Sequence, residues 1–127
     1  MKNLKLIFTL LATVVLVARF RFHARAELSE ADARAQLKRG ALVVDVRTVK
    51  EYQAGHLTNA VNIPLAELKE KPSGLGTNQA ALILLYCQSG QRSRIAEREL
   101  RALGYTNAFN IGSLKQARKI LTPAETK

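Results

Sequence analysis

The only cysteine of the chain, Cys87, follows a run of apolar residues and precedes a short polar stretch, residues 88–92. A cysteine acts as a nucleophile when it is ionised, and a nearby cation or a helix N-terminus favours ionisation. Gly90 permits the left-handed backbone of a tight concave turn, and such a turn can point several N–H groups at one anion. Arg92 adds a cation five residues after the cysteine. This spacing predicts a thiolate held in an anion-binding loop.

The segments on either side of Cys87 indicate the position of this loop in a fold. Residues 80–86 (AALILLY) are the most apolar strand that the sequence predicts, and residues 93–103 repeat apolar residues at helical spacing. Residues 87–92 then form a strand-to-helix turn of six residues, the kind of place where open α/β sheets bind ligands. The predicted apolar face of the helix consists of Ala96, Leu100 and Leu103.

The rest of the chain alternates between helix and strand patterns. Ser29 is a predicted helix N-cap, and Thr48 with Glu51 forms a predicted capping box. Helices are predicted over residues 30–39, 48–55, 64–71 and from about 113, strands over 41–46, 60–63 and 107–111, and turns over 72–79. This alternation predicts the α/β class, with a mainly parallel central sheet flanked by helices.

Length and charge limit the alternatives. A chain of 127 residues is long enough for one domain, which we place at residues 27–127. From residue 27 onward there are 15 basic and 10 acidic residues, interleaved, which leaves a net charge of +5. That surplus suits the attraction of small anions better than nucleic-acid binding, for which no motif is present. The other cations of the chain are Lys2, Lys5, Arg19, Arg21 and Arg25.

Residues 1–26 have the pattern of an export or membrane segment. The uncharged run of residues 6–18 would form a helix of about 20 Å, short of the bilayer core of about 30 Å, as in a signal peptide. Residues 24–26 (ARA) provide a small-x-small cleavage pattern, whereas the arginines that follow the run suit an uncleaved anchor through residues 6–20. A cleaved signal peptide, an anchor and a buried helix all remain open.

Exported proteins often contain disulfides, but a chain with a single cysteine cannot form one internally. The cysteine is therefore buried and inert, bonded to another chain, or free and reactive. The glycine-containing polar loop and the neighbouring Arg92 favour the reactive thiol, because an inert buried cysteine needs neither feature.

Two motifs resemble those of the rhodanese family. C-Q-S-G-Q-R-S, residues 87–93, is similar to the C-x-x-G-x-R-[S/A] active-site loop of rhodaneses. VVDVRTVKEYQAGHLTNAVNIPL, residues 43–65, resembles their D-V-R…E-[Y/F]…G-H-[I/L]…A-x-N-I-P segment. The resemblance covers roughly residues 28–115, and the short exported layout is similar to the phage-shock type of periplasmic rhodanese. It implies a rhodanese-like domain in the periplasm or otherwise exported, with inner-membrane anchoring as the alternative.

The resemblance also assigns roles to residues. It implies that Cys87 is the nucleophile that accepts sulfur, that the backbone of residues 88–93 is the persulfide cradle, and that Arg92 anchors the loop and its anion. For the residues that match the upstream motif (Asp45, Arg47, Glu51 and His56) we expect a structural role in ion pairs and hydrogen bonds. The implied substrate-binding residues are Gln88, Ser89, Gly90, Gln91, Arg92 and Ser93. Asn59 stands where the family often has glycine, and Gly112-Ser113 replaces a frequent Gly-Gly.

These roles imply a sulfurtransferase of the thiosulfate type, which works by double displacement. The Cys87 thiolate takes the outer sulfur of a small anionic donor such as thiosulfate and passes it to a thiophilic acceptor, cyanide or a thiol. We expect a monomer that needs no metal or organic cofactor.

Three other functions would also use a cysteine in such a loop. A cysteine phosphatase or arsenate reductase requires arginine six residues after the cysteine, where this chain has Ser93. A thiol oxidoreductase requires a second cysteine where this chain has Gly90. A persulfide carrier or sulfide-sensing module uses the same cysteine, so the sequence leaves that alternative open.

Overall fold

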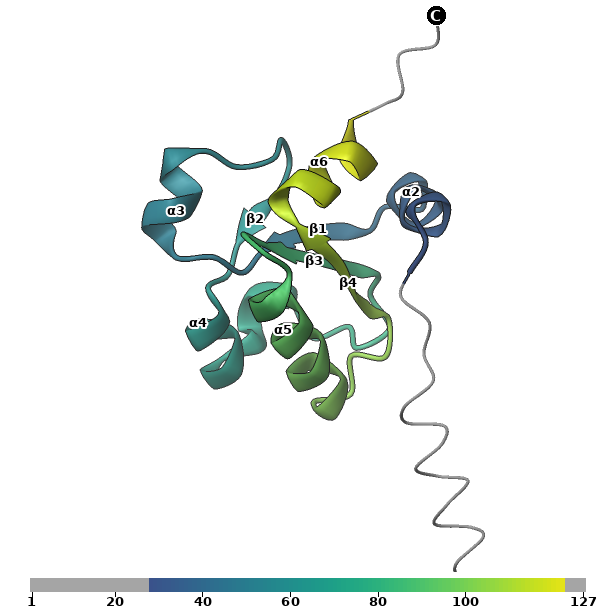
Figure 1. The fold of residues 1–127 in the computed structure, drawn as a ribbon. Helices are drawn as coiled ribbons and strands as arrows, with labels where there is room; N and C mark the ends of the chain where they lie inside the picture. Colours follow the sequence, from purple (N-terminus) through teal and green to yellow (C-terminus); the bar gives the residue numbers. More distant parts are fainter. Residues whose placement is uncertain (1–27, 123–127) are drawn as a thin grey trace, which may run out of the picture.

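The computed structural model describes residues 28–122, and the predicted export or anchor segment lies outside this range. Helices and strands alternate along the chain, which confirms the predicted α/β class (Figure 1). The elements are α2 (Glu30–Lys38), β1 (Leu42–Asp45), α3 (Val49–Ala54), β2 (Val61–Asn62), α4 (Leu65–Glu70), the 3-10 helix η1 (Pro72–Leu75), β3 (Ile83–Cys87), α5 (Gln91–Ala102), β4 (Ala108–Ser113) and α6 (Leu114–Leu121).

The four strands form one parallel sheet in the order β2-β1-β3-β4. β3 lies inside the sheet and all of its residues are buried, as its continuous apolar sequence requires. The pairing of β3 with β4 is regular up to Leu85 and then shifts, so that Cys87 lies opposite Ser113. This shift occurs at the carboxyl end of the sheet, beside the turn that leads to α5.

Helices cover both faces of the sheet (Figure 1). α4, η1 and α5 pack on one face, and α2 and α6 on the other. Because successive side chains of a strand point to opposite faces, Leu85 and Cys87 join the α5 side of the core while Leu84 and Tyr86 join the α6 side. The thiol therefore points toward the layer that contains the N-terminus of α5.

The predicted helix caps are present. The backbone N–H of Asp32 donates to Ser29 Oγ at 3.1 Å at the start of α2. At α3, Glu51 N–H donates to Thr48 Oγ1 at 3.2 Å, and Thr48 N–H donates to Glu51 Oε2 at 2.9 Å. This reciprocal capping box fixes the orientation of Glu51, which becomes important at the site.

The start of α5 differs from the prediction. The helix begins at Gln91 and not at Ser93, because Gly90 adopts the left-handed conformation (φ 92°) as N-cap and starts the helix two residues earlier. The turn after Cys87 is thus only residues 88–90. Leu103 is 44% exposed, contrary to its predicted place on the apolar face, because the helix ends at Ala102. Its buried row consists of Ser93, Ala96 and Leu100.

Two further segments refine the predictions. The strand predicted over residues 60–63 shortens to Val61–Asn62, and the predicted turn region 72–79 contains η1, whose Leu75 is buried against the core. Within residues 28–122, none of the helices combines the length and the hydrophobicity needed to cross a bilayer. The anchor predicted over residues 6–20 is not part of this range.

Candidate active site

Cys87 is the last residue of β3, and its thiol lies beneath the first turn of α5 with no exposure to solvent. Its Sγ accepts a hydrogen bond from the Gly90 N–H at 3.0 Å. The hydroxyl of Ser93 is a second donor, with Oγ at 3.5 Å from Sγ. Both donors belong to the N-terminal end of α5, where unpaired N–H groups and the helix dipole stabilise negative charge. The structure therefore places the sulfur where a thiolate is stabilised.

The pKa of the Cys87 thiol reflects two opposing effects. Burial raises the pKa, but hydrogen bonds from the Ser93 hydroxyl and from the N–H groups of Ser93, Gly90 and Ser89 lower it by more. The net result is a pKa below the ordinary value of a cysteine, so the thiolate fraction at neutral pH increases. The sequence suggested a neighbouring cation as one cause. Arg92 and Cys87 do interact electrostatically, because the Cys87 charge raises the pKa of Arg92, but the groups in contact with the sulfur are hydrogen-bond donors.

The cradle, residues 88–93, packs against the junction of β4 and α6, which stabilises its conformation. Ser89 forms an antiparallel bridge with Ser113, which is the N-cap of α6. A Cβ on Gly90 would approach the Cα of Gly112 to 3.4 Å, so a larger residue would crowd this junction. The Ser93 hydroxyl also lies 3.1 Å from the carbonyl oxygen of Gly90. These contacts close the turn around the sulfur.

Three polar side chains of the cradle face solvent. Gln88, Ser89 and Gln91 are exposed, so they form the rim of the site above the buried sulfur. The Gln88 side chain also contacts a buried residue, because its Oε1 accepts a hydrogen bond from Arg47 Nη1 at 3.4 Å. A reactant would approach the sulfur past these amides and this hydroxyl.

Arg92 connects the cradle to α3. Its two terminal nitrogens donate to the two carboxylate oxygens of Glu51 at 2.7 and 2.9 Å, a bidentate geometry. Hydrogen bonds from Arg92 and then from Thr48 hold the pKa of Glu51 well below its usual range. Arg92 was predicted to anchor the loop and its anion, and Glu51 is the partner through which it can anchor the loop. The sequence predicted that Glu51 is a capping residue with a structural role in an ion pair, and both roles are present, but it gave no signal that the partner would be Arg92, 41 positions away.

A buried ion pair lies under the other side of the cradle. The Arg47 guanidinium donates to the Asp45 carboxylate through Nε at 3.0 Å and through Nη2 at 2.7 Å, and both residues are almost completely buried. Arg47 Nη2 also donates to the carbonyl oxygen of Gly55 at 2.7 Å. Beside this pair, burial raises the pKa of Tyr86 to about 12, and its hydroxyl oxygen accepts the Leu57 N–H. The expected structural ion pair is therefore present.

His56 and Asn59 lie in the loop after α3. The His56 ring is stacked on Tyr52, with the ring centroids 3.7 Å apart, and its Nδ1 lies 2.9 Å from the Tyr52 carbonyl oxygen. Asn59 has a φ of 65°, which confirms that asparagine takes the left-handed conformation here in place of glycine. Both residues shape the loop that carries Gly55.

Replacing Ser93 by alanine should raise the pKa of Cys87. The substitution removes the hydroxyl, the strongest of the donors that lower the pKa, but keeps the backbone N–H. The rate of alkylation by iodoacetamide at pH 7 should fall, on the order of threefold, because less thiolate is present. The measurement is the alkylation rate as a function of pH, with Thr77→Ala, an exposed position, as control. An unchanged midpoint in the Ser93 variant would show that the hydroxyl does not act on the sulfur.

The arrangement as a whole suits one kind of chemistry. Cys87 Sγ lies within hydrogen-bond distance of the Gly90 N–H and the Ser93 hydroxyl, beneath a polar rim, and two ion pairs fix the loop that surrounds it. These features favour a nucleophilic attack by Cys87 on a small anionic substrate. Among residues 28–122, no group of three or more potential metal ligands is present.

Comparisons with known proteins agree with this geometry. A family model, the rhodanese-like domain, matches residues 28–118. The chain is 38% identical to thiosulfate sulfurtransferase PspE of Escherichia coli (strain K12) over 72 residues, which are 57% of this chain and 69% of that protein. Among solved structures it resembles the human single-domain sulfurtransferase TSTD1, with a TM-score of 0.64 and 28% identity over 76% of this chain and 97% of that one. It also resembles a rhodanese with anions from E. coli, with a TM-score of 0.57 and 35% identity over 61% of this chain and 91% of that one.

Proposed function

The chain belongs to the rhodanese-like domain family, and from this membership we propose that it is a thiosulfate-type sulfurtransferase that works by double displacement. The observation that carries the proposal is the position of Cys87 Sγ, which lies within hydrogen-bond distance of the Gly90 N–H and the Ser93 hydroxyl. The sulfurtransferase named among the relatives supports the same reaction class.

In the first half of the reaction, the Cys87 thiolate attacks the outer sulfur of thiosulfate. The S–S bond of thiosulfate breaks, and its electron pair leaves with sulfite while a new S–S bond forms at Cys87. The outer sulfur of the resulting persulfide is then an anion. The N–H groups of Ser89, Gly90 and Ser93, which lower the pKa of the Cys87 thiol, support the proposal that this loop stabilises it.

In the second half, a thiophilic acceptor removes the outer sulfur. Cyanide or a thiolate attacks it, the persulfide bond breaks, and the electron pair returns to Cys87 Sγ. The thiolate form of the site is thereby restored, and neither a metal nor an organic cofactor takes part. Arg92, fixed by Glu51, holds the cradle in one conformation during both halves.

The test combines the mass of the protein with its turnover. The purified protein is incubated with thiosulfate, and we expect a mass increase of one sulfur atom on Cys87, followed by steady thiocyanate production when cyanide is added. A persulfide without turnover would identify a carrier or sensing module instead. A folded protein that forms neither persulfide nor thiocyanate would refute the proposal.

We also propose that residues 1–26 direct the domain, residues 27–127, to the periplasm or another exported location, where it acts as a monomer. The basic head and apolar run of these residues support export, and the sequence is compatible with attachment through residues 6–20. N-terminal sequencing of the protein from a cell fraction distinguishes the cleaved form, which begins near residue 27, from the anchored form.

A further inference from the structure

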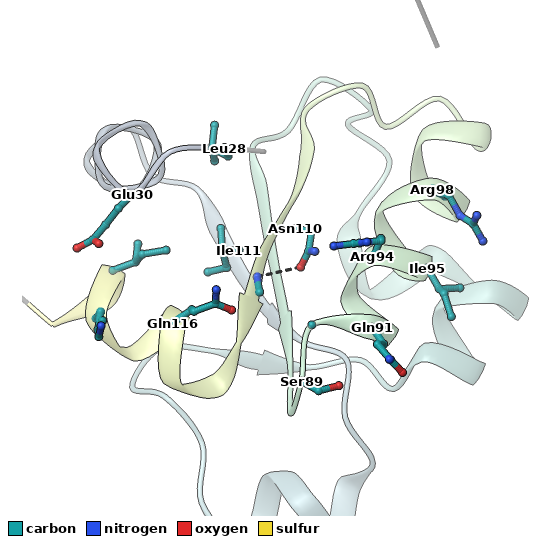
Figure 2. Close-up of a pocket in the computed structure, with 14 residues that line it drawn as sticks. Leu28, Glu30, Ser89, Gln91, Arg94, Ile95, Arg98, Asn110, Ile111 and Gln116 are labelled. Carbon is teal, nitrogen blue, oxygen red and sulfur yellow. Dashed lines mark hydrogen bonds between the residues drawn. The ribbon is translucent and has the colours of Figure 1, made fainter. Parts of the chain in front are cut away.

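A groove of about 760 Å³ lies beside the cradle, along β4, between α5 on one side and α2 and α6 on the other (Figure 2). β4 is an edge strand of the sheet, and its residues Asn110, Ile111 and Gly112 form the floor of the groove. Ser89, Gly90 and Gln91 line the end nearest the active site. Cys87 is not among the lining residues, so the groove adjoins the cradle without including the sulfur.

The size of the groove indicates a ligand larger than the donor. Its volume is within the range of about 300–1,000 Å³ that is typical of ligand-binding clefts. Thiosulfate consists of only five heavy atoms and, in the proposed reaction, reacts inside the cradle, where the Gly90 N–H points at the sulfur. A groove of this size is therefore available to the second reactant, the sulfur acceptor.

The charge of the groove indicates the chemistry of that reactant. Arg94 and Arg98, one turn apart on α5, and Lys119 on α6 are its cationic lining residues, and all three are exposed. Glu30 is the one acidic lining residue, and it is paired with Arg34 at 2.8 Å. Within residues 28–122, neither Arg98 nor Lys119 forms an ion pair. The groove is therefore positively charged and attracts carboxylates.

The outer edge of β4 is less available for recognition through the backbone. Arg101 Nη2 donates to the carbonyl oxygen of Ala108 at 2.9 Å, so one outward-facing acceptor of this strand is already occupied. The side chain of Asn110 likewise accepts the Gly112 N–H at 2.9 Å, the interaction drawn in Figure 2. Addition of a strand to this edge is thus disfavoured, and recognition must rely on the cationic side chains.

We propose that this groove binds an acidic peptide segment of the sulfur acceptor, with the accepting thiol placed over residues 88–91 and next to the Cys87 persulfide. The inference rests on the proposed function, because it assigns the acceptor of the same reaction. The acceptor thiolate attacks the outer sulfur, the persulfide bond breaks with its electron pair returning to Cys87, and the peptide leaves as a persulfide. No oxidant or reductant is consumed.

The test uses two synthetic peptides of equal length, each with one cysteine. One has two glutamates at least three residues from the cysteine, and the other has glutamines in their place, so that the thiols have similar pKa values. At low ionic strength we expect persulfide-loaded protein to transfer sulfur to the acidic peptide with a kcat/KM about fivefold higher, a preference that falls as salt is added.

Matched variants locate the effect. The double variant Arg98→Gln/Lys119→Gln should lose most of the preference for the acidic peptide, and Lys38→Gln/Lys71→Gln, which removes the same charge at exposed positions outside the groove, should keep it. Thiocyanate formation from thiosulfate and cyanide should be the same in both variants. Equal preference in the two variants, or none in the wild type, would overturn the groove inference and leave the proposed function intact.

A binding measurement tests the groove independently of persulfide formation at Cys87. A fluorescent acidic peptide with serine in place of its cysteine should bind the wild type more tightly than the Arg98→Gln/Lys119→Gln variant, whether or not a persulfide forms. Failure to form any persulfide would refute the proposed function and leave only a site for acidic peptides. Absence of binding, or equal binding to both proteins, would refute the groove itself.

Discussion

Replacement of Cys87 by serine is expected to reduce thiosulfate-dependent thiocyanate formation by at least about a thousandfold. The hydroxyl of serine is far less acidic than the thiol, and it cannot store a sulfur atom as a persulfide. The hydrogen bonds from Gly90 and Ser93 that stabilise a thiolate would meet a neutral oxygen instead. The first displacement would therefore be lost and not merely slowed.

The substitution should leave the fold intact, which makes the result interpretable. Serine is close to cysteine in size, and its hydroxyl can accept the Gly90 N–H in the same buried place. Thiocyanate formation is measured together with a thermal melt, and Lys71→Gln, at an exposed position outside the cradle, is the control. Turnover that persists in a folded Cys87→Ser protein would show that another group carries the sulfur.

Replacement of Asp45 by asparagine is expected to reduce the free energy of unfolding by about 3–5 kcal/mol. Asparagine keeps the shape of the side chain but removes the charge that balances the guanidinium of Arg47, a residue that is only 3% exposed. A buried cation without an anion costs more than the lost attraction, because water cannot replace its partner. Urea denaturation at pH 7 measures the loss.

Two comparisons determine whether burial is the cause. Glu30→Gln removes the partner of Arg34 in an exposed ion pair and should cost no more than about 1 kcal/mol. The double variant Asp45→Leu/Arg47→Met removes both buried charges and should recover part of the loss seen with Asp45→Asn. If Asp45→Asn cost no more than Glu30→Gln, the buried pair would not be a source of stability.

Much of the architecture was predictable because local signals specify it. The continuous apolar pattern of β3 predicted a buried parallel strand, and the caps at Ser29 and Thr48 marked the starts of two helices. Gly90 indicated the left-handed turn beside Cys87. Each of these features depends on residues within a few positions of one another, so the order of residues carries the information directly.

Two details of α5 were predicted wrongly: its first residue and the burial of Leu103. α5 starts at Gln91 and not at the predicted Ser93, because the left-handed Gly90 serves as its N-cap. Ser93 instead turns inward, where its hydroxyl faces Cys87 and its backbone packs in the core. Leu103 matched the apolar spacing but falls after the helix ends, which leaves it exposed.

By itself, the sequence determined the α/β class, the position of Cys87 at the end of a buried strand and the polar loop that follows it. Only the tertiary structure decided which partners hold that loop: Glu51 for Arg92, Arg47 for Gln88, and the β4–α6 junction for Gly90. It also decided that cations of α5 and α6 share a groove beside the site. The reason is that these contacts join segments far apart in the chain, and their geometry depends on how the strands are ordered and how the helices pack over them.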